Sequence, residues 1–277
     1  MDLLRIAAFA DGNQGGNPAG VWLGQTLPEA TQMQRIAADV GFSETAFAAP
    51  TAEGWRVRYF SPQSEVPFCG HATIALGAAL ALRHGDGDYA LEINHARIRV
   101  RGRRDGELIA ATLQSPPTHS RAADPALQQR ALELFGLRED DLDPRLPPAH
   151  IHGGGDHLLL ALRSREALAA MRYAQDAGRV LMDDAGWITI ALVWAESDQR
   201  FHARNAFASG GVYEDPATGA AAAAFAGYLR DRQWPHAGAI DIVQGEDMGA
   251  RSLLHIDIPP TAGSPVEVSG LARVMDS

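Results

Sequence analysis

Two stretches of this chain are apolar on every side at helical spacing, and they limit the possible folds more than any other feature. Residues 70–83 and 217–231 are rich in Ala and Leu. A helix without a polar face belongs inside a protein rather than on its surface. The rest of the chain must therefore surround two separate helices.

The two stretches align with one constant offset. Gly70 pairs with Ala217 and Leu82 with Leu229, each 147 positions apart, which is close to half of the 277 residues. Ala-rich helices resemble one another by chance, so this repeat is weak on its own. Because both halves also contain many short strand-like segments, we predict an α+β chain of two similar domains, each a β-barrel wrapped around a central helix, with the active site in the cleft between them.

Alternation and turn residues predict the other elements. We expect strands at 3–9, 19–23, 55–60, 157–163 and 187–194, more strands between 89 and 113, and helices from 27–29 to a C-cap at Gly41, at about 125–136 and at about 164–176. The Pro-rich segment 115–125 is typical of a linker. We place the domains at 1–118 and 119–264 and expect residues of about 265–277 to pack back on the first.

Charge and composition exclude several classes of protein. Asp and Glu number 34 against 24 for Lys and Arg, so the net charge is −10 and no nucleic-acid partner is expected. The one basic cluster, at 97–104, alternates as the exposed face of a hairpin does. The longest apolar run, 220–226, is far below the roughly 20 residues of a membrane span, and residues 1–5 lack a secretion pattern. We expect a cytoplasmic protein with no membrane partner.

Glu44 stands in the otherwise apolar segment 42–47. It points either outward from a strand, which is the commoner case, or into a buried pocket. Phe42, Glu44 and Ala46 share one face of a strand, so burial of the apolar pair also buries the carboxylate. Desolvation there disfavours the charged form, which is how a general base is commonly tuned toward neutral pH.

Two further segments precede the apolar helices. Cys69, Gly70 and His71 lie before the first helix, and residues 215–219 (Asp-Pro-Ala-Thr-Gly) lie before the second. Amides at a helix N-terminus bind anions, and Gly allows a ligand to come close. Two alternatives stay open: the segment fits Asp215 as an N-cap followed by Pro at N1 equally well, and a lone His at a helix start is more often structural.

Cys69 is the only cysteine, so the chain has no internal disulfide, which fits a reducing compartment. A thiol at a helix N-terminus has a stabilised thiolate and can serve as a base or nucleophile. Epimerases with two thiols need a second cysteine on the opposite side of the substrate. The position equivalent to Cys69 in the repeat is Pro216, so that mechanism is excluded.

The histidines near the triple glycine 153–155 do not predict a metal site. His150, His152, Asp156 and His157 flank flexible glycines, and structural zinc requires four ligands at tighter spacing. The glycines precede a strand, whereas those of a dinucleotide site follow one and open a helix. We therefore expect neither a metal nor a cofactor.

Five segments together resemble the phenazine-biosynthesis PhzF-like family of the diaminopimelate epimerase and proline racemase superfamily. They are residues 16–21 (GNPAGV), 42–47 (FSETAF), 65–73 (EVPFCGHAT), 214–219 (EDPATG) and 244–249 (QGEDMG). The resemblance implies a diaminopimelate epimerase-like fold of two barrel domains, usually a homodimer, and proton transfer at carbon without a metal or cofactor. In the PhzF enzyme the reaction is isomerisation of a dihydro-hydroxyanthranilate, with a glutamate moving the proton.

That glutamate matches Glu44, and its histidine and aspartate partners match His71 and Asp215. We expect these three to be catalytic and the substrate to be a small carboxylate-bearing molecule. The predicted substrate-binding residues are Asn17, Ser43, Gly70, Ala72, Thr218, Gly219 and Ala220.

Ala220 departs from the family, which commonly has serine there, so the substrate is expected to differ even though the proton-transfer residues are present. The leading hypothesis is a cofactor-independent isomerase. One alternative is an epimerase or racemase that uses Glu44 with Cys69. The other is a catalytically silent small-molecule binding protein of the same fold.

Overall fold

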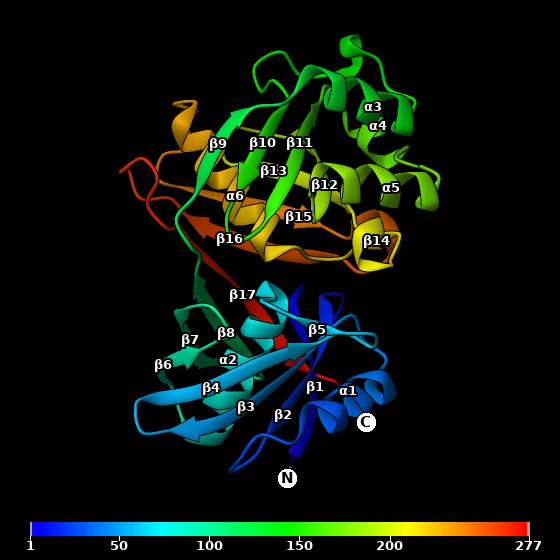
Figure 1. Ribbon diagram of the computed structural model, residues 1–277. Helices are drawn as coiled ribbons and strands as arrows, with labels where there is room; N and C mark the ends of the chain where they lie inside the picture. The colour runs from blue at the N-terminus through cyan, green and yellow to red at the C-terminus, as the bar shows by residue number, and fades with distance from the viewer. Residues whose placement is uncertain (1, 276–277) are drawn as a thin grey trace. The chain divides into compact units, whose positions relative to one another are not determined.

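Strands enclose both apolar helices in the computed structural model, which describes residues 2–275 (Figure 1). The fold is a mixed α/β one with extensive β-sheet and few helices. Of the described residues, 2–114 and 268–275 form one compact unit, here unit 1, and 115–267 form unit 2. Residues 276 and 277, the end of the segment predicted to pack back on the first domain, lie outside the described part.

Unit 1 contains two helices and most of a strand from the end of the chain. Its elements are β1 (Asp2–Ala10), β2 (Asn17–Leu23), α1 (Ala30–Val40), β3 (Thr45–Thr51), β4 (Gly54–Phe60), β5 (Glu65–Val66), α2 (Gly70–His84), β6 (Gly87–Glu92), β7 (Arg97–Asp105), β8 (Leu108–Gln114) and β17 (Glu267–Val274).

The strand pairings of unit 1 return to their starting point. From β1 they run through β2, β3, β4, β6, β7 and β8 to β17, which also pairs with β1. Two of these pairings, β2 with β3 and β4 with β6, are parallel, and α1 and α2 lie in the connections. Helix α2 contacts six strands of this ring: β1, β2, β3, β6, β7 and β8.

The sequence of α2 explains this central position. Every residue from Gly70 to Ala81 is buried, as expected for a helix with no polar face. Glycines let the helix approach β7 closely. A methyl group on Gly77 would meet the Val100 side chain, and one on Gly102 would overlap the carbonyl oxygen of Gly77 and lie 2.8 Å from Cβ of Ala81. The helix axis is thus set by contacts that leave no room for a methyl group.

In unit 2 strands likewise pack around one helix, α6, and additional helices lie outside these strands. Its elements are β9 (His119–Ala122), α3 (Pro125–Phe135), η1 (Glu139–Asp141), β10 (Ala149–His152), β11 (Asp156–Leu162), α4 (Arg165–Ala169), α5 (Gln175–Ala185), β12 (Thr189–Ala195), β13 (Arg200–Ala206), η2 (Ala208–Gly210), β14 (Glu214–Asp215), α6 (Gly219–Asp231), β15 (Ala239–Gln244), η3 (Glu246–Met248) and β16 (Ser252–Asp257).

Helix α6 is buried against β9, β10, β11 and β16. A methyl group on Gly153, between β10 and β11, would lie 2.6 Å from the backbone nitrogen of Ala224, so a glycine again permits the contact. A second core of unit 2 joins α3, α4 and α5 to β11 and β12 through apolar side chains, among them Leu132, Leu160, Leu168, Leu181 and Leu192.

Most predicted elements are present, with three differences. The helix predicted at 164–176 is wrong: α4 ends at Ala169, α5 runs from Gln175 to Ala185, and the residues between are not helical. The linker 115–125 contains a strand, β9. Helix α6 begins at Gly219, two residues later than the alignment of the apolar stretches predicts. The basic cluster does form the exposed face of the β7–β8 hairpin. None of the described helices has the length and apolarity needed to cross a membrane.

The contact between α2 and β7 makes a testable prediction. Gly102→Ala should lower the free energy of unfolding by about 1–3 kcal/mol or more, because overpacking forces backbone to move. Gly87 faces Gly102 in the β6–β7 register, and its added methyl group would meet only Tyr89, 3.8 Å away. Gly87→Ala is therefore the matched control. Urea unfolding of both variants measures the effect, and equal stability would show that the close approach is not required.

Candidate active site

Glu44 is held at the point where a turn enters β3. Helix α1 ends at Gly41, whose positive φ of 73° reverses the chain. The Glu44 carbonyl then accepts a hydrogen bond from the Gly20 amide of β2 at 3.1 Å. The Glu44 side chain is 9% exposed, so the inward orientation is confirmed. Thr45, Ala46 and Phe47 are also buried, so this end of β3 is covered on both faces.

Cys69 and His71 come from the start of α2. Cys69 is the N-cap residue, with extended backbone and no side-chain cap hydrogen bond. The turn is fixed by Thr73, whose hydroxyl donates to the Cys69 carbonyl at 2.7 Å and also contacts the Tyr59 hydroxyl at 2.7 Å. Burial raises the pKa of Tyr59, so its hydroxyl stays neutral. The helix start is therefore a rigid support for the two side chains.

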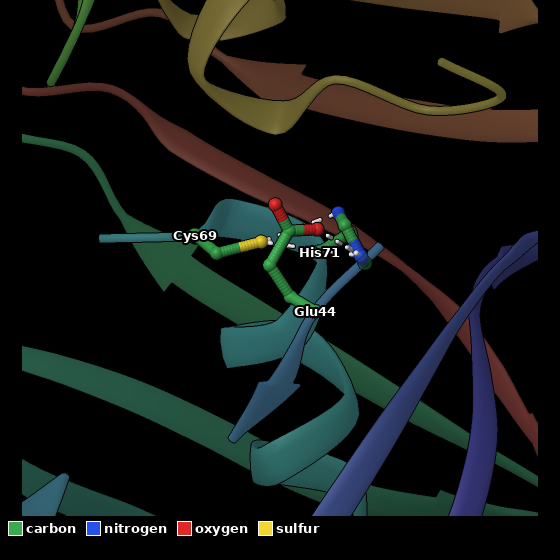
Figure 2. A group of neighbouring side chains, drawn as sticks. All are labelled: Glu44, Cys69 and His71. Atoms are coloured by element: carbon green, nitrogen blue, oxygen red, sulfur yellow. Dashed lines mark hydrogen bonds and ion pairs between the residues drawn. The ribbon is translucent and has the colours of Figure 1, made fainter. Parts of the chain in front are cut away.

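The three side chains point toward one another (Figure 2). Oε2 of Glu44 lies 3.4 Å from Nε2 of His71, whose side chain is only 5% exposed. Sγ of Cys69 lies 3.3 Å from Nδ1 of the same ring. Ser43 adds a hydroxyl 3.4 Å from Nε2. Oε2 of Glu44 is buried and has no hydrogen-bond partner within the described residues.

A carboxylate oxygen that is buried without a hydrogen bond is costly, because it has lost water without replacing it. Unsatisfied buried groups are few in native structures, and a catalytic role is one explanation for them. The neighbouring imidazole can hold or release a proton within reach of it. Chemically, this cluster can take a proton from a bound molecule and return it.

The other residues of unit 1 that were predicted to bind substrate lie on the same supports. Gly70 and Ala72 are buried in the first turn of α2, Ser43 precedes Glu44, and Asn17 is a buried residue at the start of β2.

In unit 2, Asp215 and Thr218 form a second polar group before α6. Asp215 is in β14 and is paired with Asn205 of β13, while Thr218 is the N-cap residue of α6. The interpretation of Asp215 as an N-cap is therefore wrong. The Thr218 hydroxyl donates to Oδ2 of Asp215 at 2.6 Å. Gly219 is the first residue of α6, and Ala220, next to it, is partly buried.

Gln244 holds this second group together. Its Nε2 donates to the Asp215 carbonyl at 2.7 Å and lies 3.0 Å from the Thr218 hydroxyl, while its Oε1 accepts from the Thr218 amide at 3.2 Å. The side chain is fully buried. The sequence placed Gln244 in a family-like segment without assigning it a role. That segment was the only signal in the sequence that pointed to Gln244.

Arg204 and Glu214 support the strand that carries Asp215. Their guanidinium and carboxylate make two hydrogen bonds, at 2.9 and 2.5 Å, and both side chains are almost fully buried. Burial disfavours the charge, but the hydrogen bonds to Glu214 hold the pKa of Arg204 above its usual value. Nη1 also donates to the carbonyls of Leu168, Ala169 and Met171. These carbonyl groups lie at the end of α4 and just after it, within the segment that was predicted to be one longer helix.

The histidines around the triple glycine have structural partners. His152 contacts Asp156 at 2.8 Å, and His150 lies 3.6 Å from the same carboxylate. His157 is fully buried, contacts the Thr189 hydroxyl at 2.8 Å, and has its pKa lowered by burial to about 3. The structure does not bring His157 together with the others as ligands: among the described residues, the group positioned to hold a metal ion is Glu44, Cys69 and His71.

The site of unit 1 thus brings together a buried carboxylate, an imidazole and a thiol at the start of a helix. The chain belongs to the PhzC-PhzF family of phenazine biosynthesis-like proteins, whose family model matches residues 6–276. This confirms the resemblance inferred from the five segments.

Individual relatives agree with this family. The chain is 32% identical to a trans-2,3-dihydro-3-hydroxyanthranilate isomerase of Pseudomonas aeruginosa, over 96% of this chain and 94% of the relative. The solved structure of a predicted epimerase from the same species has a TM-score of 0.85 at 25% identity, covering 99% of this chain and 96% of that chain. A hydroxyproline epimerase of Agrobacterium vitis shares the fold, with a TM-score of 0.62 at 11% identity, covering 99% and 88%. Several relatives are named as isomerases, which supports assigning this chain to that class of enzyme.

Loss of the Gln244 hydrogen bonds should loosen the Asp215–Thr218 turn. Gln244→Leu is expected to lower the free energy of unfolding by about 1–3 kcal/mol for each buried group left unpaired. Hydrogen exchange of the Thr218 amide should also accelerate. Gln199→Leu is the control, because Gln199 is exposed and its side chain donates one long hydrogen bond, 3.3 Å to the His236 carbonyl. Wild-type stability and protection in Gln244→Leu would contradict this role.

Proposed function

We propose that this enzyme is a cofactor-independent isomerase that moves a proton between carbon atoms of a small carboxylate-bearing substrate. The observation that carries the proposal is the buried Oε2 of Glu44, which has no hydrogen-bond partner among the described residues and lies 3.4 Å from Nε2 of His71. Glu44 takes a proton from carbon, the electron pair shifts into the conjugated system of the substrate, and Glu44 returns the proton at a second carbon. No net oxidation occurs, so no redox partner is needed.

His71 positions the Glu44 carboxylate and assists the transfer. The amides at the start of α2 bind anionic oxygens of the substrate, since amides without an intrahelical partner and the helix dipole favour negative charge there. The start of α6, in unit 2, offers amides of the same kind. Asp215 acts in the same reaction, a role that rests on its match to the family motif. We also propose that each unit is a β-barrel around its helix, which the returning strand pairings of unit 1 support.

The substrate class follows the relatives only in part. The Pseudomonas aeruginosa relative is a trans-2,3-dihydro-3-hydroxyanthranilate isomerase. This chain has Ala220 where the family commonly has serine, so one hydroxyl at the start of α6 is missing. We propose a related carboxylate with a less polar group facing Ala220.

A second candidate is an epimerase in which Cys69 acts as the partner of Glu44. The observation that favours it is the thiol 3.3 Å from an imidazole nitrogen at a helix N-terminus, an arrangement that stabilises a thiolate. This reaction inverts one carbon and moves the proton nowhere else, so the positions of incorporated deuterium separate it from isomerisation.

Glu44→Gln tests the base directly. The amide keeps the shape of the side chain and cannot accept the proton, so exchange of substrate hydrogen with deuterium oxide should fall by about 10²–10⁴-fold while ligand binding persists. A panel of cyclic and acyclic amino and hydroxy acids, read by mass spectrometry, identifies the substrate first. Glu53→Gln, an exposed carboxylate of unit 1 paired with Arg97, is the control. Retention of more than roughly a tenth of the wild-type rate removes Glu44 from the mechanism.

Cys69→Ser distinguishes the two candidates. If Glu44 carries the proton, the thiol only lines the site and its replacement should reduce exchange modestly. A thiol base replaced by serine should instead be nearly inactive, because an unassisted hydroxyl is a much weaker base than a thiolate. Unfolding curves first establish that wild type and Cys69→Ser are equally stable, and the exchange rates of the two proteins are then compared. Loss of exchange in Cys69→Ser favours the epimerase.

A further inference from the structure

The proposed isomerase reaction uses Glu44 and His71 and assigns no chemistry to Cys69. Yet the thiol is the third member of the cluster, and all three ligand-type atoms lie within 4.8 Å of one another. Each residue also keeps a small exposed fraction, from 5% for His71 to 9% for Cys69, so the cluster is not sealed from solvent.

The ligand types match one class of metal ion. A thiolate, an imidazole and a carboxylate are the ligands that Zn²⁺ takes in proteins, with bonds of about 2.0–2.3 Å in tetrahedral geometry. Such bonds place the ligand atoms roughly 3.4–3.6 Å apart. Nε2 of His71 is 3.4 Å from Oε2 of Glu44 and 3.9 Å from Sγ of Cys69, so shifts of a few tenths of an ångström complete the arrangement.

The unpartnered carboxylate oxygen is an independent sign of a ligand. Oε2 of Glu44 is buried, lacks a hydrogen-bond partner among the described residues, and faces the other two groups. A cation bound there would satisfy it. Three protein ligands leave the fourth zinc position open to water, as in zinc sites that are not fully enclosed by the protein.

We propose that Glu44, Cys69 and His71 form an inhibitory binding site for Zn²⁺. On binding, the thiol releases its proton to solvent and the metal takes the lone pair with which Glu44 accepts a proton. Metal binding and proton transfer therefore exclude each other. The binding site stands on the geometry alone, and only its inhibitory effect rests on the proposed function.

Co²⁺ is the first probe, because a cobalt–thiolate bond has a charge-transfer absorption and Cys69 is the only cysteine in the chain. Titration of the purified protein should develop this absorption to one equivalent, and Zn²⁺ should displace it. Cys69→Ser should abolish the absorption. Zn²⁺ affinity, measured against a chelating indicator, should fall at least about 100-fold in Cys69→Ser and Glu44→Gln, since even outer-shell partners are worth about 10–100-fold.

The control removes the other place where histidines meet. The rings of His119 and His152 lie 4.5 Å apart, next to Asp156. A double variant, His119→Ala with His152→Ala, should keep the cobalt–thiolate absorption and the Zn²⁺ affinity. Absence of the thiolate absorption in the wild type, or loss of zinc binding in the double variant alone, overturns the site.

Inhibition is measured separately, as deuterium exchange at increasing free Zn²⁺. Exchange by the wild type should stop as the site fills, and exchange by Cys69→Ser should persist to at least about 100-fold higher Zn²⁺. Binding without loss of exchange overturns the inhibition and leaves the site. Binding by a protein with no exchange on any substrate tells against the proposed function instead, because the cobalt and zinc titrations use no substrate.

Discussion

The close contact of α2 with β7 is the constraint on which unit 1 depends. Gly77 and Gly102 let the helix backbone reach the sheet without an intervening side chain. With the helix fixed this tightly, its first turn is fixed too, and Cys69 and His71 have little freedom relative to the strands. Glu44 reaches the same place from β3, whose neighbour β2 also contacts α2. Precision at the site therefore comes from packing of small residues rather than from a hydrogen-bond network around the carboxylate.

The two polar groups before the apolar helices are supported in different ways. In unit 2 the Asp215–Thr218 turn is tied by Gln244 and by the buried pair of Arg204 and Glu214, so nearly every polar atom has a partner. In unit 1 Oε2 of Glu44 has no hydrogen-bond partner among the described residues and lies 3.4 Å from Nε2 of His71. Satisfied buried networks give rigidity, whereas an unsatisfied acceptor retains free energy that a proton or cation can recover. Among the described residues the unit 2 group is thus the more fully hydrogen-bonded of the two, and the unit 1 group keeps an acceptor available to a ligand.

Sequence reasoning succeeded where a pattern was local and failed where a distant residue decided. The apolar helices could be predicted because a helix without a polar face has to be buried. Helix α3 could be predicted because Asp124, Pro125 and Gly136 mark its two ends. Burial of Glu44 was also predicted, but by alternation, whereas β3 is covered on both faces there and Phe42 is only partly buried. The end of α4 depends on Arg204, 35 positions from Ala169, and the role of Gln244 depends on a turn 26 positions away. Neither contact could be predicted from a local pattern, because its two partners lie far apart in the sequence.

The thiol belongs to the one cluster for which we propose two opposed chemistries. At the start of α2 the helix amides favour an anion, which stabilises a thiolate as readily as a bound carboxylate. A site that accepts protons also presents lone pairs, and three lone pairs on a thiol, an imidazole and a carboxylate within 4.8 Å are a zinc ligand set. A proton-transfer enzyme with this cluster works only while metal stays away from Glu44. Replacing Cys69 removes the softest ligand and its contact with Nδ1 of His71 but leaves the Glu44 and His71 side chains in place, so we expect zinc sensitivity and proton transfer to be separable.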